Sequence, residues 1–385
     1  MADNKDKKVL NVPGLRFPEF TEEWKEERLG KIAELSKGVG ISKEQLSEDG
    51  EPCILYGELY TKYKSEIIHK VISKTNIESS NLKRSKRNDV IIPCSGETAI
   101  DIAVARCVPF DNILLGGDLN IIRLHKDDGA FMAYQLNGKR KIDIAKLAQG
   151  VSVVHLYGEN IKSIKTYNPC LQEQQKIVKL LSMLDERIEV QNKIIEDLKK
   201  LKSAIRKRVF TSLKNEHTES YEINQLLSYE QPTAYIVTND EYSADTALTP
   251  VLTANKGFVL GYTDEDSGIY QKGECIIFDD FTMDAKYVSF PFKVKSSAIK
   301  ILTAKPNVNL RFMFEYLSYL GLKSEEHKRH YISEIASLVI ELPSKEKQNR
   351  IANLMTSLDN KLALEEKAKA RYEDKKRYLL SQMFI

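Results

Sequence analysis

An acidic pair with a nearby lysine is the group of residues in this sequence that most resembles a catalytic centre. Asp279 and Asp280 follow an apolar run typical of a strand, and Lys286 comes soon after them. Two carboxylates and a lysine in this setting are compatible with a metal-dependent nuclease. A simple acidic turn at the end of a strand is the competing and more ordinary interpretation.

Other patterns that would indicate catalysis or a metal site are missing from the sequence. It has no GxxxxGK[ST] loop for ATP, and its only Asn-Pro pair, at Asn168, lacks the Pro-aromatic continuation that an adenine methyltransferase needs. Its five cysteines are scattered, with no closely spaced pair for zinc and an odd number that disfavours a disulfide framework. We therefore expect buried reduced thiols, and no catalytic residue, metal or cofactor in this chain.

Length and composition predict a multidomain protein of nearly balanced charge. The chain has 385 residues, more than one domain usually holds, and 42% of them are hydrophobic. Lysine and arginine number 58 against 55 for aspartate and glutamate, so any basic surface for nucleic acid must be placed locally. No apolar stretch is long enough for a signal peptide or a membrane span, so we expect a cytoplasmic protein without membrane contact.

An internal repeat predicts two long helices. Residues 169–210 align with residues 343–384 without a gap at an offset of 174, which matches Gln174 with Gln348 and Lys202 with Lys376. Each copy opens with a proline, then lacks proline and glycine, and its apolar residues recur at alternating spacings of three and four. We expect an antiparallel coiled coil through Ile177, Leu181, Leu184, Ile188, Ile195, Leu198 and Ile205 of the first helix and Ile351, Met355, Leu358, Leu362, Tyr372 and Leu379 of the second. At 1.5 Å per residue, each helix would span roughly 60 Å and act as a rigid spacer.

The segments that precede the two helices are related more loosely. Residues 29–32 correspond to residues 223–226 at an offset of 194, so the second unit is shorter than the first. Three β-like runs align as well: residues 54–58 with 251–255, 89–97 with 274–282, and 115–124 with 294–302. We therefore predict an α+β protein in which two β-rich units share a fold but carry different loop tips, an arrangement typical of recognition.

Several short motifs along the chain are shared with one known family. Residues 12–20 (VPGLRFPEF), with Trp24 and residues 29–30 (LG), open the sequence, and Pro169 with residues 172–177 (QEQQKI) opens the first helix. The second unit adds residues 229–233, 250–253, 278–282 and 295–297. Over essentially its whole length, the sequence resembles the specificity subunits of type I restriction-modification systems. The entry of the second helix, residues 345–348 (KEKQ), departs from the family's more apolar pattern.

The resemblance implies a pseudo-two-fold molecule that reads DNA for its partners. We expect an N-terminal arm at 1–18, target recognition domain 1 at 19–167, spacer helix 1 at 168–215, target recognition domain 2 at 216–341 and spacer helix 2 at 342–385. Such a subunit is not catalytic, and it recognises a bipartite, non-palindromic target in double-stranded DNA through the major groove. It docks two methyltransferase subunits, which carry S-adenosylmethionine and methylate adenine. The full complex adds two restriction subunits that use ATP and Mg²⁺.

Turns of the two units are the expected sites of DNA contact. Basic and hydroxyl side chains donate to phosphates and base edges, and carboxylates accept from cytosine amino groups. In the first unit the candidates are Tyr56, Glu58, Lys62, Ser95, Glu97 and Asp118, with Lys83, Arg84, Lys86 and Arg87 as a phosphate-facing run. In the second they are Thr253, Asn255, Lys256, Asp279, Asp280, Thr282, Lys286, Lys295, Ser296 and Ser297. A solvated surface loop is the alternative for the basic run.

A coiled-coil adaptor that joins proteins without reading DNA is the principal alternative for the whole chain. The ten basic and five acidic residues between positions 176 and 208 fit either a solvated helix face or contact with DNA or partner subunits. The duplicated but unequal units favour the specificity subunit. If the helices set the unread spacer between half-sites, inserting one turn into both should lengthen it.

Overall fold

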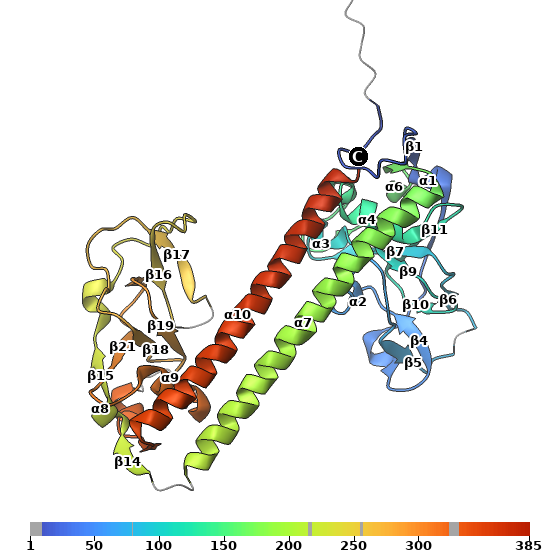
Figure 1. Ribbon diagram of the computed structural model, residues 1–385. Coiled ribbons are helices and arrows are strands. Elements are labelled where there is room, and N and C mark those ends of the chain that lie inside the picture. The colour runs from blue at the N-terminus through green and yellow to red at the C-terminus, as the bar shows by residue number, and fades with distance from the viewer. Residues whose placement is uncertain (1–9, 79, 215–217, 255–256, 323–330) are drawn as a thin grey trace, which may run out of the picture. The chain divides into compact units, whose positions relative to one another are not determined.

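The computed structural model describes residues 10–78, 80–214, 218–254, 257–322 and 331–385, which belong to two compact units. Unit 1 comprises Met1–Asn192 and Lys367–Ile385, and unit 2 comprises Lys193–Glu366. Helices α7 (Leu171–Leu213) and α10 (Lys345–Gln382) each contribute to both units (Figure 1). The boundary in α10, after residue 366, lies 174 positions beyond the boundary in α7, after residue 192, so the units divide the internal repeat evenly.

Unit 1 is built around a four-stranded antiparallel sheet in the order β2-β11-β7-β9. A second sheet has the order β3-β5-β4-β10-β6, and β1–β13 and β8–β12 form two-stranded pairs. The strands are β1 (Lys25–Arg28), β2 (Ala33–Lys37), β3 (Leu46–Ser47), β4 (Glu51–Ile54), β5 (Ser73–Thr75), β6 (Lys83–Arg84), β7 (Asp89–Pro93), β8 (Ser95–Gly96), β9 (Arg106–Val108), β10 (Leu114–Leu115), β11 (Leu119–Leu124), β12 (Val154–His155) and β13 (Lys165–Asn168). The helices are α1 (Leu29–Ile32), the 3-10 helix η1 (Lys43–Gln45), α2 (Glu58–Thr61), α3 (Ala99–Ile102), α4 (Gly129–Asn137), α5 (Lys141–Ala145) and α6 (Gly158–Ile161).

Unit 2 has a four-stranded antiparallel sheet in the order β15-β21-β18-β19, a three-stranded sheet β17-β16-β20 and the pair β14–β22. Its strands are β14 (Glu219–Glu222), β15 (Leu227–Glu230), β16 (Thr249–Leu252), β17 (Val259–Thr263), β18 (Cys275–Asp279), β19 (Ala285–Val288), β20 (Lys293–Val294), β21 (Ile299–Ala304) and β22 (Val339–Leu342). Its helices are α8 (Ile223–Leu226), the 3-10 helix η2 (Pro232–Tyr235), α9 (Leu310–Leu320) and the π-helix η3 (Tyr331–Ile335).

The two units share one topology, which confirms the predicted α+β fold with an internal repeat. The sheet order β2-β11-β7-β9 matches β15-β21-β18-β19, and the pair β1–β13 matches β14–β22. Each unit also has one parallel pair in its second sheet, β4 with β10 and β16 with β20. Strands β7 and β18 are buried along their whole length, as expected for inner strands of the main sheet. They are therefore the equivalent centres of the two units.

A repeated glutamine fastens each long helix to the helix that covers its unit's main sheet. Gln174 at the start of α7 accepts a hydrogen bond from the backbone N–H of Asp128 (2.8 Å), and Asp128 caps α4. Gln348 at the start of α10 accepts one from the backbone N–H of Asn309 (2.8 Å), which caps α9. Both glutamines also donate to a proline carbonyl, at 2.9 Å. Gln174 and Gln348 are therefore equivalent in the structure as well as in the repeat, because each makes the same local contacts at the start of its long helix.

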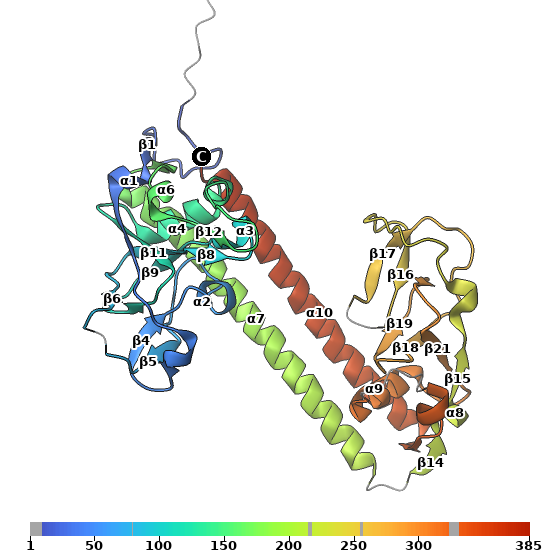
Figure 2. The same ribbon diagram turned by 180° about the vertical axis from the view of Figure 1, so that it is seen from behind.

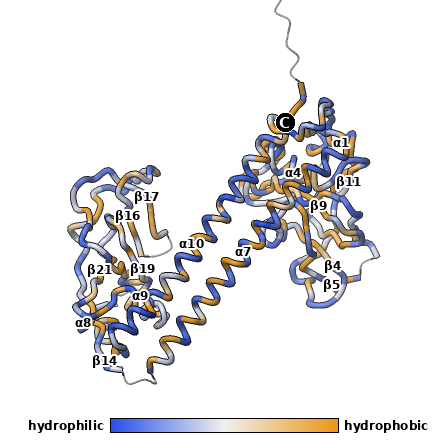
Figure 3. The backbone as a smooth tube through the Cα atoms, viewed as in Figure 1, coloured by the Kyte–Doolittle hydropathy of each residue, from blue (hydrophilic) through white to orange (hydrophobic). Residues whose placement is uncertain are grey.

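Helices α7 and α10 pack antiparallel within each unit. In unit 1, Leu181 of α7 and Leu379 of α10 share a core with Phe131, and in unit 2, Phe210 of α7 and Ile351 of α10 share another. Of the predicted pairing residues, Ile177, Leu181, Leu184, Ile195, Ile351, Met355 and Leu379 are buried, while Ile188, Leu198, Ile205, Leu358, Leu362 and Tyr372 are half-buried. Figure 3 shows hydrophobic positions alternating with hydrophilic ones along both helices, as an amphipathic pair requires. Within the described part of the chain, no helix has the length and apolar character needed to cross a membrane.

Candidate functional site

The turn after β4 in unit 1 exposes Tyr56 but uses Glu58 internally. The carboxylate of Glu58 is buried, accepts the backbone N–H of Leu55 (3.0 Å) and pairs with Lys62 at 2.6 Å. Ser73 of β5 also donates to it. The prediction that Glu58 contacts DNA is therefore wrong for this conformation, because its lone pairs already hold the turn together. Tyr56 stays exposed beside it.

The basic run of unit 1 splits into paired and exposed residues. Lys83 and Arg84 form the short strand β6 and are half-buried, and Arg84 pairs with Glu51 at 2.7 Å. Lys86 and Arg87 lie on the following turn with exposed side chains. The turn is shaped by backbone bonds from Lys86 to Asp89 and from Arg87 to Asp111, each 2.8 Å. Lys86 and Arg87 are the two exposed residues of the run and are therefore the best placed to contact phosphates.

A hollow of about 720 Å³ in unit 1 brings together residues from four segments. Tyr56 and Tyr60 line it from α2 and the preceding turn, Glu97 from the segment after β8, and Val153 from the segment before β12. Figure 2 shows β8 and β12 next to α3 on this part of the unit. Of the other candidates, Ser95 is buried and donates to Asp118 at 3.2 Å, and Asp118 is exposed. The structure therefore brings Tyr56, Ser95 and Glu97 together.

Tyr60, Val151 and Val153 also lie in this region and were not predicted from the sequence. Tyr60 donates to the carbonyl of Ser95 at 2.9 Å and so links α2 to β8. Val151 and Val153 are 98% and 51% exposed. Residues 150–154 (GVSVV) are rich in β-branched residues, which is the pattern of a buried strand, so sequence alone gave no reason to place them on a surface.

The acidic pair of unit 2 is buried and structural. Asp279 accepts the backbone N–H groups of Phe281 and Thr282, both at 2.9 Å, and so caps the turn after β18. Asp280 and Lys300 are each 1% exposed and lie 3.3 Å apart, and the other oxygen of Asp280 accepts the backbone N–H of Tyr331 at 2.8 Å. Both predicted DNA contacts are therefore wrong for this conformation. The nuclease hypothesis is not supported either, because both carboxylates are bound to other residues of the same chain.

The remaining candidates of unit 2 lie on two surface turns. Thr282 is exposed on the turn between β18 and β19, and Lys286 is half-buried in β19. Lys295, Ser296 and Ser297 are exposed between β20 and β21. Thr253 is half-buried after β16, while Asn255 and Lys256 lie outside the described residues. Hydroxyl and ammonium groups on such turns suit contacts with phosphates and base edges.

Each unit ties α7 to α10 through a cluster of charges. In unit 1, Lys376 of α10 lies 2.5 Å from both Asp185 of α7 and Glu66, and we call these three residues node 1. In unit 2, Lys202 of α7 lies 2.5 Å from Asp359 of α10 and 3.4 Å from Glu315 of α9, and these three residues form node 2. Asp185 and Asp359 are 174 positions apart, as are Lys202 and Lys376, so the repeat places the same acid-base pair at two equivalent crossings.

Burial and charge act in opposite directions on the amine of node 1. Burial alone would lower the pKa of Lys376, but the charges of Glu66 and Asp185 outweigh that effect and hold its pKa above the ordinary value. Tyr134 of α4 also donates to Asp185 at 2.6 Å. The node therefore keeps a charged lysine inside the unit with all its carboxylate partners satisfied.

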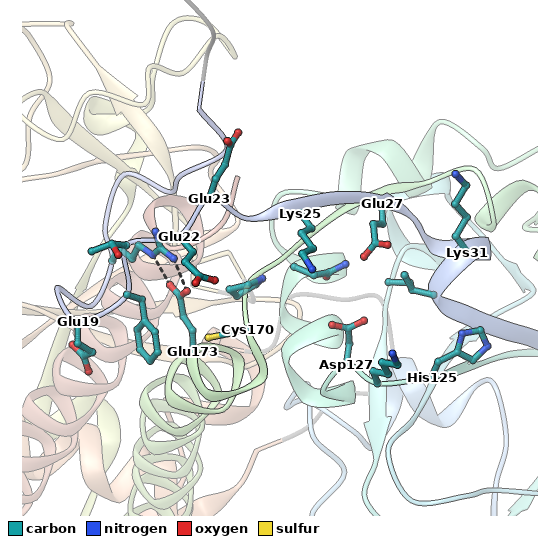
Figure 4. Close-up of a pocket in the computed structure, with 17 residues that line it drawn as sticks. Glu19, Glu22, Glu23, Lys25, Glu27, Lys31, His125, Asp127, Cys170 and Glu173 are labelled. Carbon is teal, nitrogen blue, oxygen red and sulfur yellow. Dashed lines mark hydrogen bonds and ion pairs between the residues drawn. The ribbon is translucent and has the colours of Figure 1, made fainter.

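A cavity of about 700 Å³ lies between the N-terminal arm and the start of α7 in unit 1. Arg16 of the arm makes two 2.7 Å hydrogen bonds to Glu173, whose side chain is fully buried in the first turn of α7 (Figure 4). Acidic and basic side chains such as Glu27, Lys31 and Asp127 line the rest. Across the described residues, no three His, Cys, Asp or Glu side chains are grouped to hold a metal ion. We interpret this region as the joint that fastens the arm to the helix.

The cysteines mostly fit the expectation of buried thiols. Cys53, Cys94, Cys107 and Cys275 are buried, and burial raises the pKa of the Cys53 thiol to about 11 and that of Cys107 to about 12. Cys170 is exposed just before α7 and corrects the expectation that all five are buried. The four buried thiols are therefore inert packing residues.

Comparison with known proteins gives one consistent family. A family model for the type I restriction modification DNA specificity domain matches residues 21–200 and 215–373. The EcoR124I/EcoR124II type I restriction enzyme specificity subunit of Escherichia coli is 44% identical over 127 residues, which span 31% of each chain. A crystal structure of a type I restriction-modification S subunit from M. genitalium superposes with a TM-score of 0.67 at 17% identity, covering 97% of this chain and 99% of that one. A structure described for complex assembly and conformational transition of the type I R-M system superposes with a TM-score of 0.54 at 14% identity, covering 95% and 98%.

Proposed function

The chain belongs to the type I restriction modification DNA specificity family, and from this premise we propose that it selects the DNA sequence on which a type I complex acts. Each unit would read one half of a bipartite, non-palindromic target through the major groove. The observation that carries the proposal is the duplication itself. Two units of one topology present different surface turns, Tyr56, Glu97 and Arg87 in unit 1 against Thr282, Lys295 and Ser296 in unit 2. Two different readers on one scaffold are what an asymmetric target requires.

We propose further that the expected domain boundaries apply, with readers at 19–167 and 216–341 and spacer helices at 168–215 and 342–385. The antiparallel packing of α7 and α10 supports this division, because it joins the two readers through uninterrupted helices. The number of base pairs left unread would then depend on the length of the paired helices.

Outward faces of the two long helices support a second part of the proposal, the docking of two methyltransferase subunits. Val190 of α7 and Leu364 of α10 are 174 positions apart and are 55% and 64% exposed. Apolar side chains at equivalent exposed positions of a repeat provide two similar contacts for two copies of one partner. Methyl transfer from S-adenosylmethionine, and restriction with ATP and Mg²⁺ where restriction subunits join, would belong to those partners. We propose that the assembled complex acts on genomic DNA in the cytoplasm.

Mapping of adenine methylation tests the proposal. The genome of cells expressing this chain with its methyltransferase subunits would be compared with that of cells lacking only this chain. We expect one split, non-palindromic methylated motif that depends on the chain. If the complex assembles and no chain-dependent motif appears, the chain is an adaptor without sequence specificity.

A further inference from the structure

Unit 1 contains a small two-segment structure that has no counterpart among the described residues of unit 2. Between the equivalent strands β18 and β19, unit 2 has only the tight turn 280–284. Between β7 and β9, unit 1 has residues 94–105, which include β8 and α3. A second segment, residues 149–156, pairs with the first through Val154 opposite Gly96 and His155 opposite Ser95. Both segments border the hollow that Tyr56 and Tyr60 line.

The second segment presents valines to solvent. Gly150 has a φ of +121°, and a Cβ there would lie 2.2 Å from the carbonyl oxygen of Val153, so only glycine fits this turn. The turn leaves Val151 98% exposed and Val153 51% exposed. Ile100 of the first segment is 45% exposed as well. Because the turn keeps these apolar side chains exposed to solvent, they can bury surface against an apolar group of a ligand.

The first segment presents a carboxylate beside Val153 of the second segment. Glu97 is exposed and lines the hollow together with Val153. The β8–β12 register continues from the Val154–Gly96 pair toward these two residues. Close to DNA, a carboxylate is repelled by the phosphates unless it accepts a hydrogen bond from a base amino group, and cytosine N4 offers that group in the major groove.

Resting on the proposed function, we propose that Glu97, Val151 and Val153 are base-reading residues of unit 1. Glu97 accepts a hydrogen bond from the N4 amino group of a cytosine, and the two valines contact the 5-methyl group of a thymine. The half-site of unit 1 therefore contains a cytosine and a thymine. The acids first assigned to base reading in unit 2, Asp279 and Asp280, have no such role because they are buried.

The thymine contact is tested with deoxyuridine, which lacks only the 5-methyl group. Once methylation mapping has defined the target, the complete methyltransferase complex is titrated with duplexes carrying deoxyuridine at each thymine of both half-sites in turn. We expect binding to weaken about fourfold at one thymine, the effect of removing one buried methyl group. The variant V151A/V153A should bind the thymine and deoxyuridine duplexes equally. Val339, an exposed valine of unit 2, gives the matched control V339A, which should keep the fourfold difference.

The cytosine contact is tested by the motif that the cell's genome acquires. E97A should reduce discrimination at one cytosine of the same half-site by about tenfold, and E97Q should shift that position toward adenine, because glutamine pairs with adenine N6 and N7. The other half-site should stay unchanged in both variants. Assembly of each variant with the methyltransferase subunits shows that it is folded.

The outcomes separate this inference from the proposed function. A wild-type complex without any motif overturns the proposed function. A wild-type motif with no deoxyuridine effect at any thymine of either half-site overturns the role of the valines, even if the valine variants do not fold. An unchanged motif in an assembled E97A complex overturns the role of Glu97.

Discussion

Glu97 and Asp280 show how the same functional group serves different ends in the two units. Both residues follow the inner strand of their unit's main sheet, β7 and β18. Glu97 is exposed, whereas Asp280 lies 3.3 Å from Lys300 with both side chains 1% exposed. A buried ion pair adds little stability relative to an apolar pair, but removing one partner is costly because the other charge is left without compensation. Asp280 therefore serves folding, whereas the exposed Glu97 is the carboxylate that we propose for recognition.

Substitution of Asp280 should separate these roles. Among the described residues, D280A leaves Lys300 with Gln231, 3.0 Å away, as its remaining partner, and should lower the free energy of unfolding by roughly 3 kcal/mol. The comparison is K286A, which removes a half-buried lysine from the neighbouring strand and should weaken DNA binding with little loss of stability. Urea unfolding by circular dichroism and DNA binding by the assembled complex measure the two effects. If D280A has normal stability but has lost DNA binding, Asp280 would instead be a DNA-contacting residue.

At the level of elements, the two charge clusters fix the register of α7 against α10. Asp185 meets Lys376 in node 1, and Lys202 meets Asp359 in node 2, in each case at 2.5 Å. Apolar stripes of leucine and isoleucine tolerate sliding by a heptad, but an acid-base pair at a defined crossing does not. Buried polar residues that specify register are well known in coiled coils. The nodes also contact the covering helices: Tyr134 of α4 donates to Asp185 in node 1, and Glu315 of α9 pairs with Lys202 in node 2.

Removal of the lysine of node 1 should destabilise unit 1. K376M leaves Asp185 and Glu66 as two neighbouring buried carboxylates without their cation and should lower the free energy of unfolding by about 3 kcal/mol. The adjacent Lys375 is exposed, so K375M is the matched control and should change stability by less than about 0.5 kcal/mol. Thermal and urea unfolding compare the two variants. Equal stability of both would show that node 1 does not stabilise unit 1.

For the whole molecule, the repeat gives one chain two related but unequal units. Residue 366, where unit 2 ends in α10, lies 174 positions after residue 192, where unit 1 ends in α7, so each unit combines the beginning of one long helix with the end of the other. Phe384 packs on Phe131 in unit 1 as Phe210 packs on Phe312 in unit 2, with ring centroids 5.2 and 5.4 Å apart. Because both helices pass through both units, a change in their length acts on the two units together.

Lengthening both helices should therefore change the unread spacer. Seven residues inserted at the unit boundaries, after residue 192 and after residue 366, preserve the heptad phase and add about 10 Å at 1.5 Å per residue. We expect the methylated motif to keep its two half-sites and to gain about three base pairs between them, at 3.4 Å per base pair. Insertion into α7 alone breaks the antiparallel register and should abolish methylation. An unchanged spacer after the double insertion would contradict this role of the helices.

The sequence by itself determined the repeat, the two amphipathic helices and the paired β-rich units, because these features follow from local periodicity and from the match at a constant offset. It also marked Lys202 and Lys376 as repeated positions, although their pairing with Asp359 and Asp185 across the helices became visible only in the structure. Tertiary structure alone decided which turn residues face solvent. Glu58 is engaged by Ser73, and Asp280 by Lys300, partners that are distant in sequence, while the glycine turn at Gly150 exposes valines whose pattern predicts burial. Whether a polar side chain is free to read DNA depends on such long-range contacts, which spacing along the chain does not encode.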